Sequence, residues 1–343
     1  MSEPPKPILR VRNLETRFYA SFGVVRAVDG VSLDVHPGET LGLVGESGSG
    51  KTVTAMSILR LVSSPGRIVA GTIELEGVDL LGLEAEEMRR VRGSQLSTVF
   101  QNPMTALNPA LRIGWQLDEA YLAHRKRGSK TGARNKAIEM LRSVGIAEAE
   151  KRAESYPHEY SGGMRQRIVI AMGMMNEPKL IIADEPTTAL DVTIQAQVID
   201  LLKRLIAEHD MALILITHNM GLVANMCDRV AVMYAGQIVE EAPIDELFYD
   251  PRHPYTWALL RSLPSIEKTG QRLPAIPGLP PDMSNPPSGC RFRARCPFVE
   301  VICEQPPPLA VLENGRSTRC WVAQRGETFA GRDQSLLRGG ELG

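Results

Sequence analysis

Apolar and polar residues alternate in short runs near the start of the chain, over residues 8–35. This alternation is typical of strands with one buried face, and the short runs predict antiparallel strands. After a turn around Pro37, the apolar run Thr40–Val44 predicts a buried strand, and residues 51–62 have the pattern of a helix that follows a glycine-rich loop. The sequence therefore predicts a strand, a loop and a helix in direct succession.

Further along the chain, helices alternate with short apolar runs. Residues from about 85 to 175 are mostly helical in pattern, and two buried strands follow at Leu180–Ala183 and Ala212–Ile216 with the amphipathic helix Val192–His209 between them. Buried strands that alternate with helices imply a parallel sheet covered on both faces. Residues 229–240 predict a closing hairpin, and the fold class is α/β.

The composition is that of an ordinary globular protein, with 343 residues, 43% hydrophobic and 23% charged. The formal net charge of −1 argues against a dedicated nucleic-acid binder, because neutralising phosphates needs a basic excess. The longest apolar run, Ile168–Met175, is far below the roughly 20 residues that cross a bilayer, and the N-terminus has no apolar stretch of the signal-peptide type. We therefore expect a soluble, cytosolic chain that can still sit on a membrane protein.

A phosphate-binding motif, G-x-x-x-x-G-K-[ST], lies between the predicted buried strand and helix. Its residues are Gly45, Glu46, Ser47, Gly48, Ser49, Gly50, Lys51 and Thr52. The glycines let backbone N–H groups curl around phosphates, while Lys51 reaches the β- and γ-phosphates and the Thr52 hydroxyl coordinates magnesium. The N-terminus of the helix adds its dipole to the anion site. The motif in this context predicts nucleotide binding.

A second part of such a site comes from the apolar strand that ends at Asp184 and Glu185. Ligands of open parallel sheets bind at the carboxyl ends of the strands. Asp184 is therefore expected to hold the magnesium, and Glu185 to orient or deprotonate the attacking water.

The sequence Tyr160-Ser161-Gly162-Gly163-Met164 precedes a predicted helix. It resembles the signature motif of ATP-binding cassette (ABC) ATPases, whose usual form is Leu-Ser-Gly-Gly-Gln; the Ser-Gly-Gly core is intact here. Physically, Ser161 and the glycine N–H groups form a second anion cup. In the family this cup closes on the γ-phosphate bound by the other subunit, which implies a head-to-tail dimer.

The resemblance also implies roles for individual residues outside these motifs. Gln101 matches the glutamine that touches magnesium and the attacking water, and Asp191 matches the aspartate that communicates across the dimer. His218 matches the histidine that contacts the γ-phosphate and holds Glu185. Phe18 is expected to stack on adenine, with Tyr19 as the alternative because adjacent strand residues face opposite ways. Since Glu185 and His218 are both present, we expect real ATP hydrolysis.

The resemblance covers roughly residues 8–250 and implies the nucleotide-binding domain of an ABC ATPase. That fold combines a RecA-like parallel-sheet core, an antiparallel β subdomain and a helical insertion at about 85–175. Residues 251–330 form a separate C-terminal extension, in which eleven of the 24 prolines lie between Pro264 and Pro308. We expect this proline-rich stretch to build little core from apolar burial.

The C-terminal extension indicates a particular subfamily. Arg252–Thr256, followed by a helix and a proline-rich segment with cysteines, resembles the C-terminal region of dipeptide/oligopeptide ABC importer ATPases. Four of the five cysteines lie here with the spacing C-x5-C-x6-C-x16-C, at Cys290, Cys296, Cys303 and Cys320. Disulfides are rare in a reducing cytosol, so a metal site is the leading interpretation. The fifth, Cys227, is interpreted as a small buried apolar residue.

Some relatives with such a tail carry a [4Fe–4S] cluster, and the resemblance implies that the four cysteines are its ligands. Zinc and reduced structural thiols stay open, although zinc ribbons favour C-x2–4-C pairs that this chain lacks. Four arginines could offset the charge of a cluster: Arg291, Arg293, Arg295 and Arg319.

The resemblance implies an ATPase that powers import of di- or oligopeptides from the cytoplasmic face of the cell membrane. Its implied partners are two transmembrane permeases, docked near Gln101–Leu107, a second and paralogous ABC ATPase chain, and indirectly an extracytoplasmic substrate-binding protein. Nickel and glutathione importers have similar motif sequences, so the identity of the substrate stays open. A soluble ABC ATPase acting on DNA or ribosomes is disfavoured by the single cassette, the lack of a heptad run and the balanced charge. The ATPase of an exporter is disfavoured by the resemblance of the tail to peptide importers.

Overall fold

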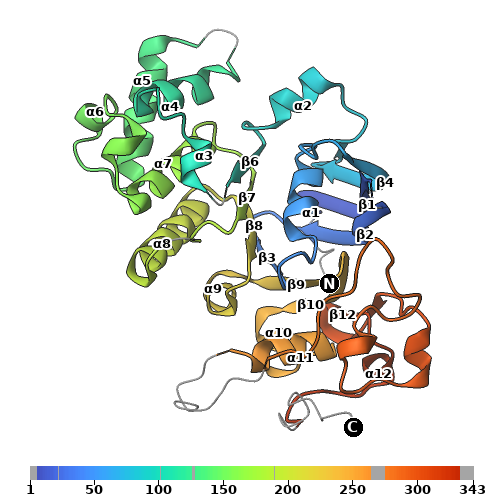
Figure 1. Cartoon of the computed structure of the whole chain (residues 1–343). Helices are drawn as coiled ribbons and strands as arrows, with labels where there is room; N and C mark the ends of the chain where they lie inside the picture. The colour runs from blue at the N-terminus through green and yellow to red at the C-terminus, as the bar shows by residue number, and fades with distance from the viewer. Residues whose placement is uncertain are drawn as a thin grey trace. The chain divides into compact units, whose positions relative to one another are not determined.

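The computed structural model describes residues 6–21, 23–100, 102–125, 128–188, 190–263 and 275–332. The chain forms two compact units, each assembled from separate stretches of sequence (Figure 1). The first unit contains the residues up to Leu9, Asp34–Thr40 and Glu74–Ile216. The second unit contains Arg10–Leu33, Leu41–Ile73 and the chain from Thr217 onward.

The first unit is built on three parallel strands, β6 (Leu96–Val99), β7 (Leu180–Asp184) and β8 (Ala212–Thr217). Strand β7 lies in the middle, with Leu180 paired to Leu96 on one side and to Ala212 on the other. All five residues of β7 are buried, as expected for an apolar strand inside a parallel sheet. The predicted strands at 180–183 and 212–216 are confirmed.

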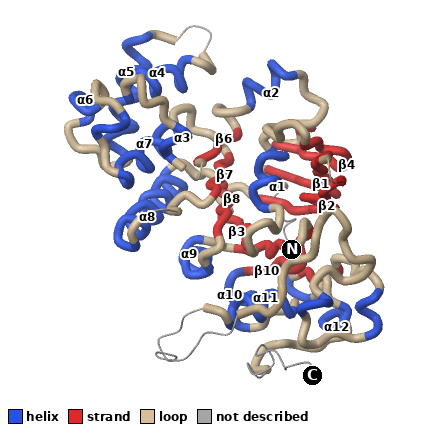
Figure 2. Tube along the Cα trace, viewed as in Figure 1, coloured by secondary structure: helices blue, strands red, loops and turns tan. Residues whose placement is uncertain are grey.

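Helices make up most of the remainder of the first unit, and α4 to α7 lie together in Figures 1 and 2. Their bounds, with those of the short strand β5, are α2 Ala85–Val91, α3 Pro103–Ala106, α4 Ile113–Leu122, α5 Lys130–Ser143, α6 Ala149–Arg152, α7 Gly162–Met174, α8 Val192–Glu208 and β5 Val78–Asp79; a 3-10 turn spans Pro157–Glu159. Helix α7 is central, because it packs against α3, α4, α5 and α8 as well as β6. The helical prediction for 85–175 is confirmed, except that β6 lies within it.

The second unit begins with long strands, β1 (Leu9–Ala20) and β2 (Gly23–Val35), which form a sheet with β4 (Gly66–Leu75) in the order β2-β1-β4. Their burial alternates along each strand, as the alternating sequence predicts. Strand β3 (Thr40–Val44) is buried throughout and is followed by α1 (Lys51–Ile58). The predicted succession of strand, loop and helix is confirmed.

Strand β3 belongs to another set of hydrogen-bonded strands in the second unit. It is parallel to β9 (Arg229–Tyr234), which forms an antiparallel hairpin with β10 (Gln237–Pro243), and this confirms the predicted hairpin. Two short strands from the C-terminal extension complete the series, because β12 (Ser317–Thr318) pairs with β10 and β11 (Ala310–Val311) pairs with β12. The extension is therefore hydrogen-bonded into the same sheet as β3.

Further helices of the second unit are α9 Met220–Met226, α10 Ile244–Tyr249, α11 Pro254–Arg261 and α12 Trp321–Gln324, with 3-10 turns at Arg293–Arg295, Val301–Glu304 and Glu313–Gly315. The extension also has a core of its own, which the sequence did not predict. Trp257 and Phe329 are fully buried there with Val322 and Ala323, and Phe298 packs against them. Burial of aromatic rings supplies the apolar contact that the prolines do not.

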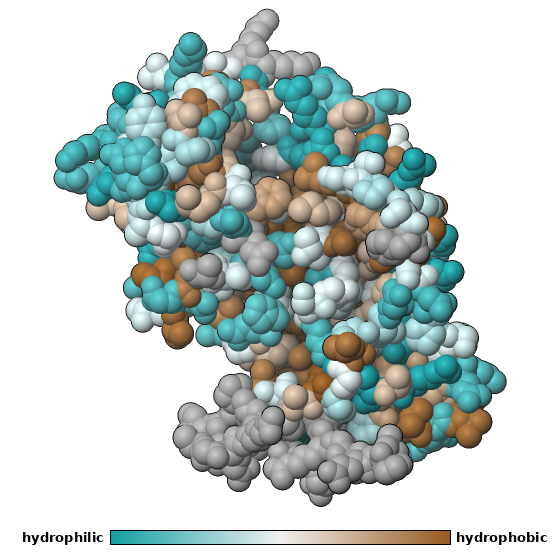
Figure 3. Space-filling model, in the orientation of Figure 1, coloured by the Kyte–Doolittle hydropathy of each residue, from teal (hydrophilic) through white to brown (hydrophobic). Residues whose placement is uncertain are grey.

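On the face drawn in Figure 3, apolar residues occur singly or in small groups among hydrophilic ones. Within the described ranges, no helix is both long enough and apolar enough to cross a membrane.

Candidate functional site

The phosphate loop between β3 and α1 depends on two glycines at its ends. Gly45 has φ +152°, and a Cβ there would lie 2.2 Å from the carbonyl oxygen of Met233. Gly50 has φ +106°, and its Cβ would lie 2.4 Å from the carbonyl oxygen of Ala27. Because no other residue fits either position without moving backbone, the loop conformation is fixed by these two residues.

Lys51 lies at the start of α1 with its side chain folded back over the loop. Its Nζ donates to the carbonyl oxygens of Gly45, at 2.8 Å, and Glu46, at 2.9 Å. The residue is only 7% exposed, while Ser47, Gly48 and Thr52 are exposed on the loop and the first turn of the helix. A buried ammonium group held by carbonyls beside exposed backbone N–H groups is an arrangement suited to bind phosphates.

In the first unit, Asp184 is buried at the end of β7, as the sequence predicts. Glu185 follows with φ +46°, a conformation that non-glycine residues rarely adopt. Its N–H donates to the carbonyl oxygen of Ile216, and its carboxylate accepts a hydrogen bond from the Thr188 hydroxyl at 2.8 Å. Such strained residues cluster at functional sites, where the surroundings hold them in place. The backbone strain therefore supports a functional role for Glu185.

Ser161 caps the N-terminus of α7 by accepting a hydrogen bond from the Met164 N–H. This confirms that Ser161 opens a helix. Gly163 permits close packing, since a Cβ there would lie 2.5 Å from a methyl group of Ile194, and Gly162 is exposed beside it. Asp191 likewise caps α8, accepting from the Ile194 N–H at 3.0 Å. Both caps give these residues a structural function in addition to the expected ones.

For the remaining predicted site residues, the structure gives mainly burial and position. His218 is exposed directly after β8. Phe18 is half-buried, whereas Tyr19 on the opposite face of β1 is 45% exposed with the Arg67 guanidinium 5.8 Å from the centre of its ring. The assignment of the adenine-stacking residue to Phe18 stays a prediction. Gln101 lies outside the described residues.

The four cysteines of the extension line one small pocket of about 10 Å³ together with His253 and Phe292. This volume is about enough for one water molecule. Within the described residues, no group of three or more His, Cys, Asp and Glu side chains is arranged to hold a metal ion, so the iron–sulfur prediction is unsupported by the geometry. Burial raises the pKa of the thiols of Cys290, Cys296 and Cys320, to about 12 at Cys320, which favours protonated thiols in this arrangement.

Cys227 is buried, and burial raises its pKa to about 12, in agreement with its interpretation as a small apolar residue.

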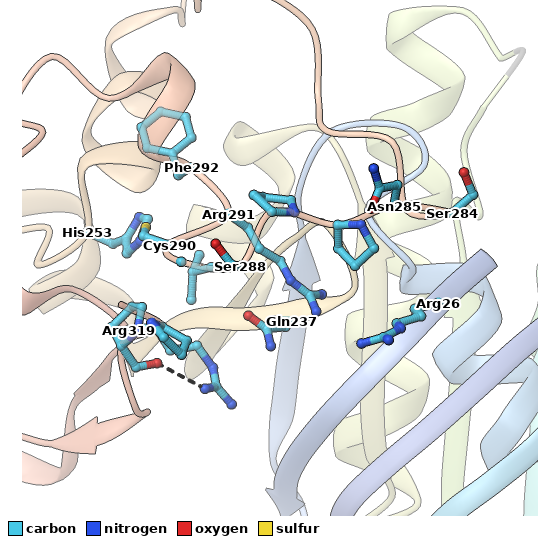
Figure 4. Close-up of a pocket in the computed structure, with 16 residues that line it drawn as sticks. Arg26, Gln237, His253, Ser284, Asn285, Ser288, Cys290, Arg291, Phe292 and Arg319 are labelled. Carbon is cyan, nitrogen blue, oxygen red and sulfur yellow. Dashed lines mark hydrogen bonds between the residues drawn. The ribbon is translucent and has the colours of Figure 1, made fainter. Parts of the chain in front are cut away.

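The arginines beside these cysteines have partners of their own, which the sequence analysis did not predict. Arg291 pairs with Asp29, and Arg295 pairs with Glu46 through both of its terminal nitrogens. Arg319 donates to the carbonyl oxygen of Ile238 at 2.9 Å. Figure 4 shows Arg291 and Arg319 with Arg26 around a polar pocket of about 340 Å³. Arg291 and Arg295 thus anchor the extension within the second unit instead of serving only as counter-charges for a cluster.

Tyr255 is another residue whose role was missed. Its hydroxyl accepts a hydrogen bond from the backbone N–H of Glu46 at 2.8 Å, and its ring packs against Tyr234 and Phe292. The sequence analysis singled out the Arg252–Thr256 run only for its resemblance to importer tails. No local pattern indicated that a residue 209 positions away would contact the phosphate loop.

Comparisons with known proteins define the class. Residues 28–188 match the family described as ABC transporter, and residues 239–303 match the family described as oligopeptide/dipeptide transporter, C-terminal region. The solved dimer of an ATP-binding cassette in a post-hydrolysis state, bound to ADP and Pi, matches with a TM-score of 0.62 and 25% identity, over 69% of this chain and 98% of that chain.

Curated relatives match over nearly the whole chain. The oligopeptide transport ATP-binding protein OppD of Bacillus subtilis is 50% identical over 92% of this chain and 88% of its own length. The dipeptide transport ATP-binding protein DppD of the same organism is 48% identical over 93% of this chain and 96% of its own length. The chain belongs to the ATP-binding protein family of ABC transporters, which confirms the resemblance found in the sequence.

Proposed function

We propose that this chain is the ATP-hydrolysing subunit that powers an ABC importer of di- and oligopeptides. The observation that carries the proposal is the 50% identity to an oligopeptide transport ATP-binding protein across both the cassette and the extension. The match of residues 239–303 to the C-terminal region of oligopeptide/dipeptide transporters supports the same substrate class.

The roles proposed for the site residues follow from the chemistry of the phosphate loop and of the strand that ends at Asp184. For Gln101, His218, Asp191 and the Ser161–Gly163 motif, they follow from the resemblance to ABC ATPases. Lys51 neutralises the β- and γ-phosphates, and Thr52, Asp184 and Gln101 hold magnesium. Glu185 orients or deprotonates the attacking water, with His218 at the γ-phosphate. Residues Ser161, Gly162 and Gly163 close on the nucleotide of the facing cassette, and Asp191 carries communication across that interface. ATP shifts the pair of cassettes towards a closed state by contacts that the open state lacks.

The proposed partners are two transmembrane permeases, a second and paralogous ATPase chain, and indirectly an extracytoplasmic binding protein. The chain is placed peripherally on the cytoplasmic face of the membrane. The docking face for the permeases is proposed around Gln101–Leu107, where Met104 is 57% exposed and Trp115 in the next helix is 47% exposed. A permease helix docked here would cover both of these apolar side chains.

The activity is tested with Glu185→Gln, using Glu208→Gln in an exposed part of α8 as the matched control. We expect the first variant to bind ATP, lose hydrolysis by at least about 100-fold and accumulate as an ATP-bound dimer, since the base is gone and the nucleotide contacts remain. Hydrolysis at the wild-type rate would show that Glu185 is not the base.

The transport role is tested by purifying the tagged chain from gently solubilised native membranes and identifying the proteins that accompany it. Two permeases, a second cassette chain and a peptide-binding protein are expected. A nickel- or glutathione-binding protein would change the substrate, and ribosomal or DNA-repair proteins would overturn the transport role.

For the extension, the proposal keeps Cys290, Cys296, Cys303 and Cys320 as thiolate ligands of a [4Fe–4S] cluster. The proposal rests on the resemblance of the tail and on the fact that all four cysteines line one pocket; as they stand, they are not arranged to hold a metal ion. Iron and sulfide analysis of anaerobically purified protein tests it, with Cys303→Ser expected to lose iron and Cys227→Ser to retain it. Zinc without iron, or no metal at all, would overturn the assignment.

A further inference from the structure

One arginine of the extension forms a partly buried ion pair with the phosphate loop. The Arg295 side chain is 5% exposed, and its two terminal nitrogens lie 2.8 Å and 3.0 Å from the two carboxylate oxygens of Glu46. Its Nε donates to the carbonyl oxygen of Pro277 at 2.8 Å, so the guanidinium plane is fixed on a second side. A two-bond pair whose arginine is buried is geometrically specific, in contrast to a fully exposed ion pair.

A second contact holds the backbone of the same loop residue. The Glu46 N–H donates to the Tyr255 hydroxyl at 2.8 Å, and the Glu46 carbonyl accepts from Lys51. Residue Glu46 is thus held at its side chain, its N–H and its carbonyl, and two of these three contacts come from residues beyond 250.

The far side of the loop is braced indirectly by Arg291. Its guanidinium donates to the carbonyl oxygen of Ala235 and to the carboxylate of Asp29. Between these two partners lies Gly236, whose N–H donates to the carbonyl oxygen of Ser49 in the loop at 2.9 Å. Figure 4 shows Arg291 beside Cys290, so this brace starts next to a cysteine just as Arg295 does.

We propose that Arg295 and Tyr255 are positioning residues for the phosphate loop, and that the C-terminal extension thereby sets the affinity of this chain for ATP. This inference rests on the proposed function, in which the loop binds the triphosphate. In this proposal both residues act on the loop through their contacts with Glu46.

The physical reason lies in the charge of Glu46. Its carboxylate follows the first glycine of a loop that must receive several negative charges. Arg295 neutralises this carboxylate and holds it away from the loop mouth; without Arg295, it would repel the phosphates and compete for Lys51. The loop would also lose a fixed point, so part of the binding free energy would go into ordering it.

The test measures the Kd of a fluorescent ATP analogue with Mg²⁺ for the full-length chain. Arg295→Gln is expected to weaken binding about tenfold, raising KM for ATP with a much smaller change in kcat. The double variant Arg295→Gln/Glu46→Gln is expected to regain most of the affinity, because the uncompensated carboxylate is gone. Arg295→Lys is expected to lie between wild type and Arg295→Gln, and Tyr255→Phe to weaken binding about threefold.

The matched control is Arg316→Gln. Arg316 is also a buried arginine of the extension, 7% exposed and paired with Glu246 and Asp250 away from the loop. It is expected to lower thermal stability without changing the Kd. Equal Kd values for Arg295→Gln and wild type, or a weakening that the double variant fails to relieve, would overturn the proposal.

Lys51→Ala separates this inference from the function on which it rests. If Lys51→Ala binds ATP normally, the assignment of the loop fails. If only Arg295→Gln binds normally, the loop assignment stands and the positioning role fails.

Discussion

The phosphate loop and the C-terminal extension lie in the same unit of this protein, but different forces shape them. The loop is determined by its own sequence: Gly45 and Gly50 adopt backbone angles that side chains do not tolerate, and α1 begins directly after them. The extension has little regular structure and is held by contacts with distant residues, among them Arg295 with Glu46. Local backbone preference builds the first region, and burial with ion pairing builds the second.

Because different forces shape the two regions, different substitutions are expected to disrupt them. The loop fails when a single Cβ is added at Gly45 or Gly50, because both have positive φ and lie against the carbonyl oxygens of Met233 and Ala27. The extension fails when its small aromatic core or its buried polar contacts are removed, and it can then come loose while the cassette stays folded. Three substitutions test this comparison.

The largest effect is expected for Gly45→Ala. The added Cβ would lie 2.2 Å from a backbone carbonyl oxygen at φ +152°, so the loop must move, at a cost of ~4 kcal/mol or more. Titration with ATP is expected to show no measurable binding. Gly48→Ala is the control for added bulk, because at φ +78° its Cβ meets nothing within 4 Å and only about 1 kcal/mol of backbone strain is expected. Equal stabilities of the two variants, measured by thermal unfolding, would contradict the role given to Gly45.

A smaller and more local loss is expected for Trp257→Ala. This residue is 1% exposed in the core of the extension, with the Phe298 ring 5.3 Å away, and its removal should cost about 3–4 kcal/mol. We expect limited proteolysis to cut the extension of this variant first and to leave the cassette resistant. Trp115→Ala, at a position 47% exposed, is the control and should leave proteolysis unchanged. Simultaneous digestion of cassette and extension would show that they unfold as one.

The smallest effect concerns the pH dependence of stability at His253, which caps α11 at the start of the extension. Burial lowers the pKa of His253 to about 3. Its backbone N–H donates to the carboxylate of Glu240, and its ring Nδ1 accepts from the backbone N–H of Tyr255. The unfolded chain binds a proton at this residue below pH about 6.5, and the folded chain does so only below about 3. Stability therefore falls as the pH drops from 6.5 towards 3, by about 2 kcal/mol at pH 5.

His253→Asn keeps a side-chain acceptor at the start of α11 and removes this titration. Its unfolding midpoint is expected to fall less between pH 7 and pH 5 than that of wild type, whereas the exposed His209→Asn should behave as wild type. Glu240 acts in the opposite direction, because burial raises its pKa to about 7 and stability then falls as the pH rises from about 4.5 to 7. Identical pH profiles for His253→Asn and wild type would contradict the cost assigned to burying His253.

Much of the cassette could be predicted from the sequence. Thr40–Val44, Leu180–Ala183 and Val192–His209 all match observed elements to within a residue or two, because buried strands and amphipathic helices leave a periodic pattern. The helix that begins after Ser161 was predicted as well, whereas the capping hydrogen bond of Ser161 was seen only in the structure. The positive φ of Glu185 left no such pattern, since it depends on the hydrogen bond from its N–H to Ile216.

The extension was predicted less well. Its prolines and cysteines suggested a segment without a core, and the structure instead buries Trp257 and Phe329 together. The arginines were interpreted as counter-charges for a cluster, but Arg291 and Arg295 are paired with carboxylates of the second unit. Single residues scattered among prolines carry no periodicity, so their partners could not be deduced.

Local sequence is enough to specify the phosphate loop, the strand and helix beside it, and the family to which the chain belongs. Each of these features leaves a recognisable pattern of neighbouring residue types, such as the glycines, Lys51 and Thr52 of the loop. The contacts between the extension and the loop are visible only in the folded chain, since Tyr255 and Arg295 lie 209 and 249 positions from Glu46. A contact at that separation exists because the folded chain buries both groups together, and burial makes each of them require a partner.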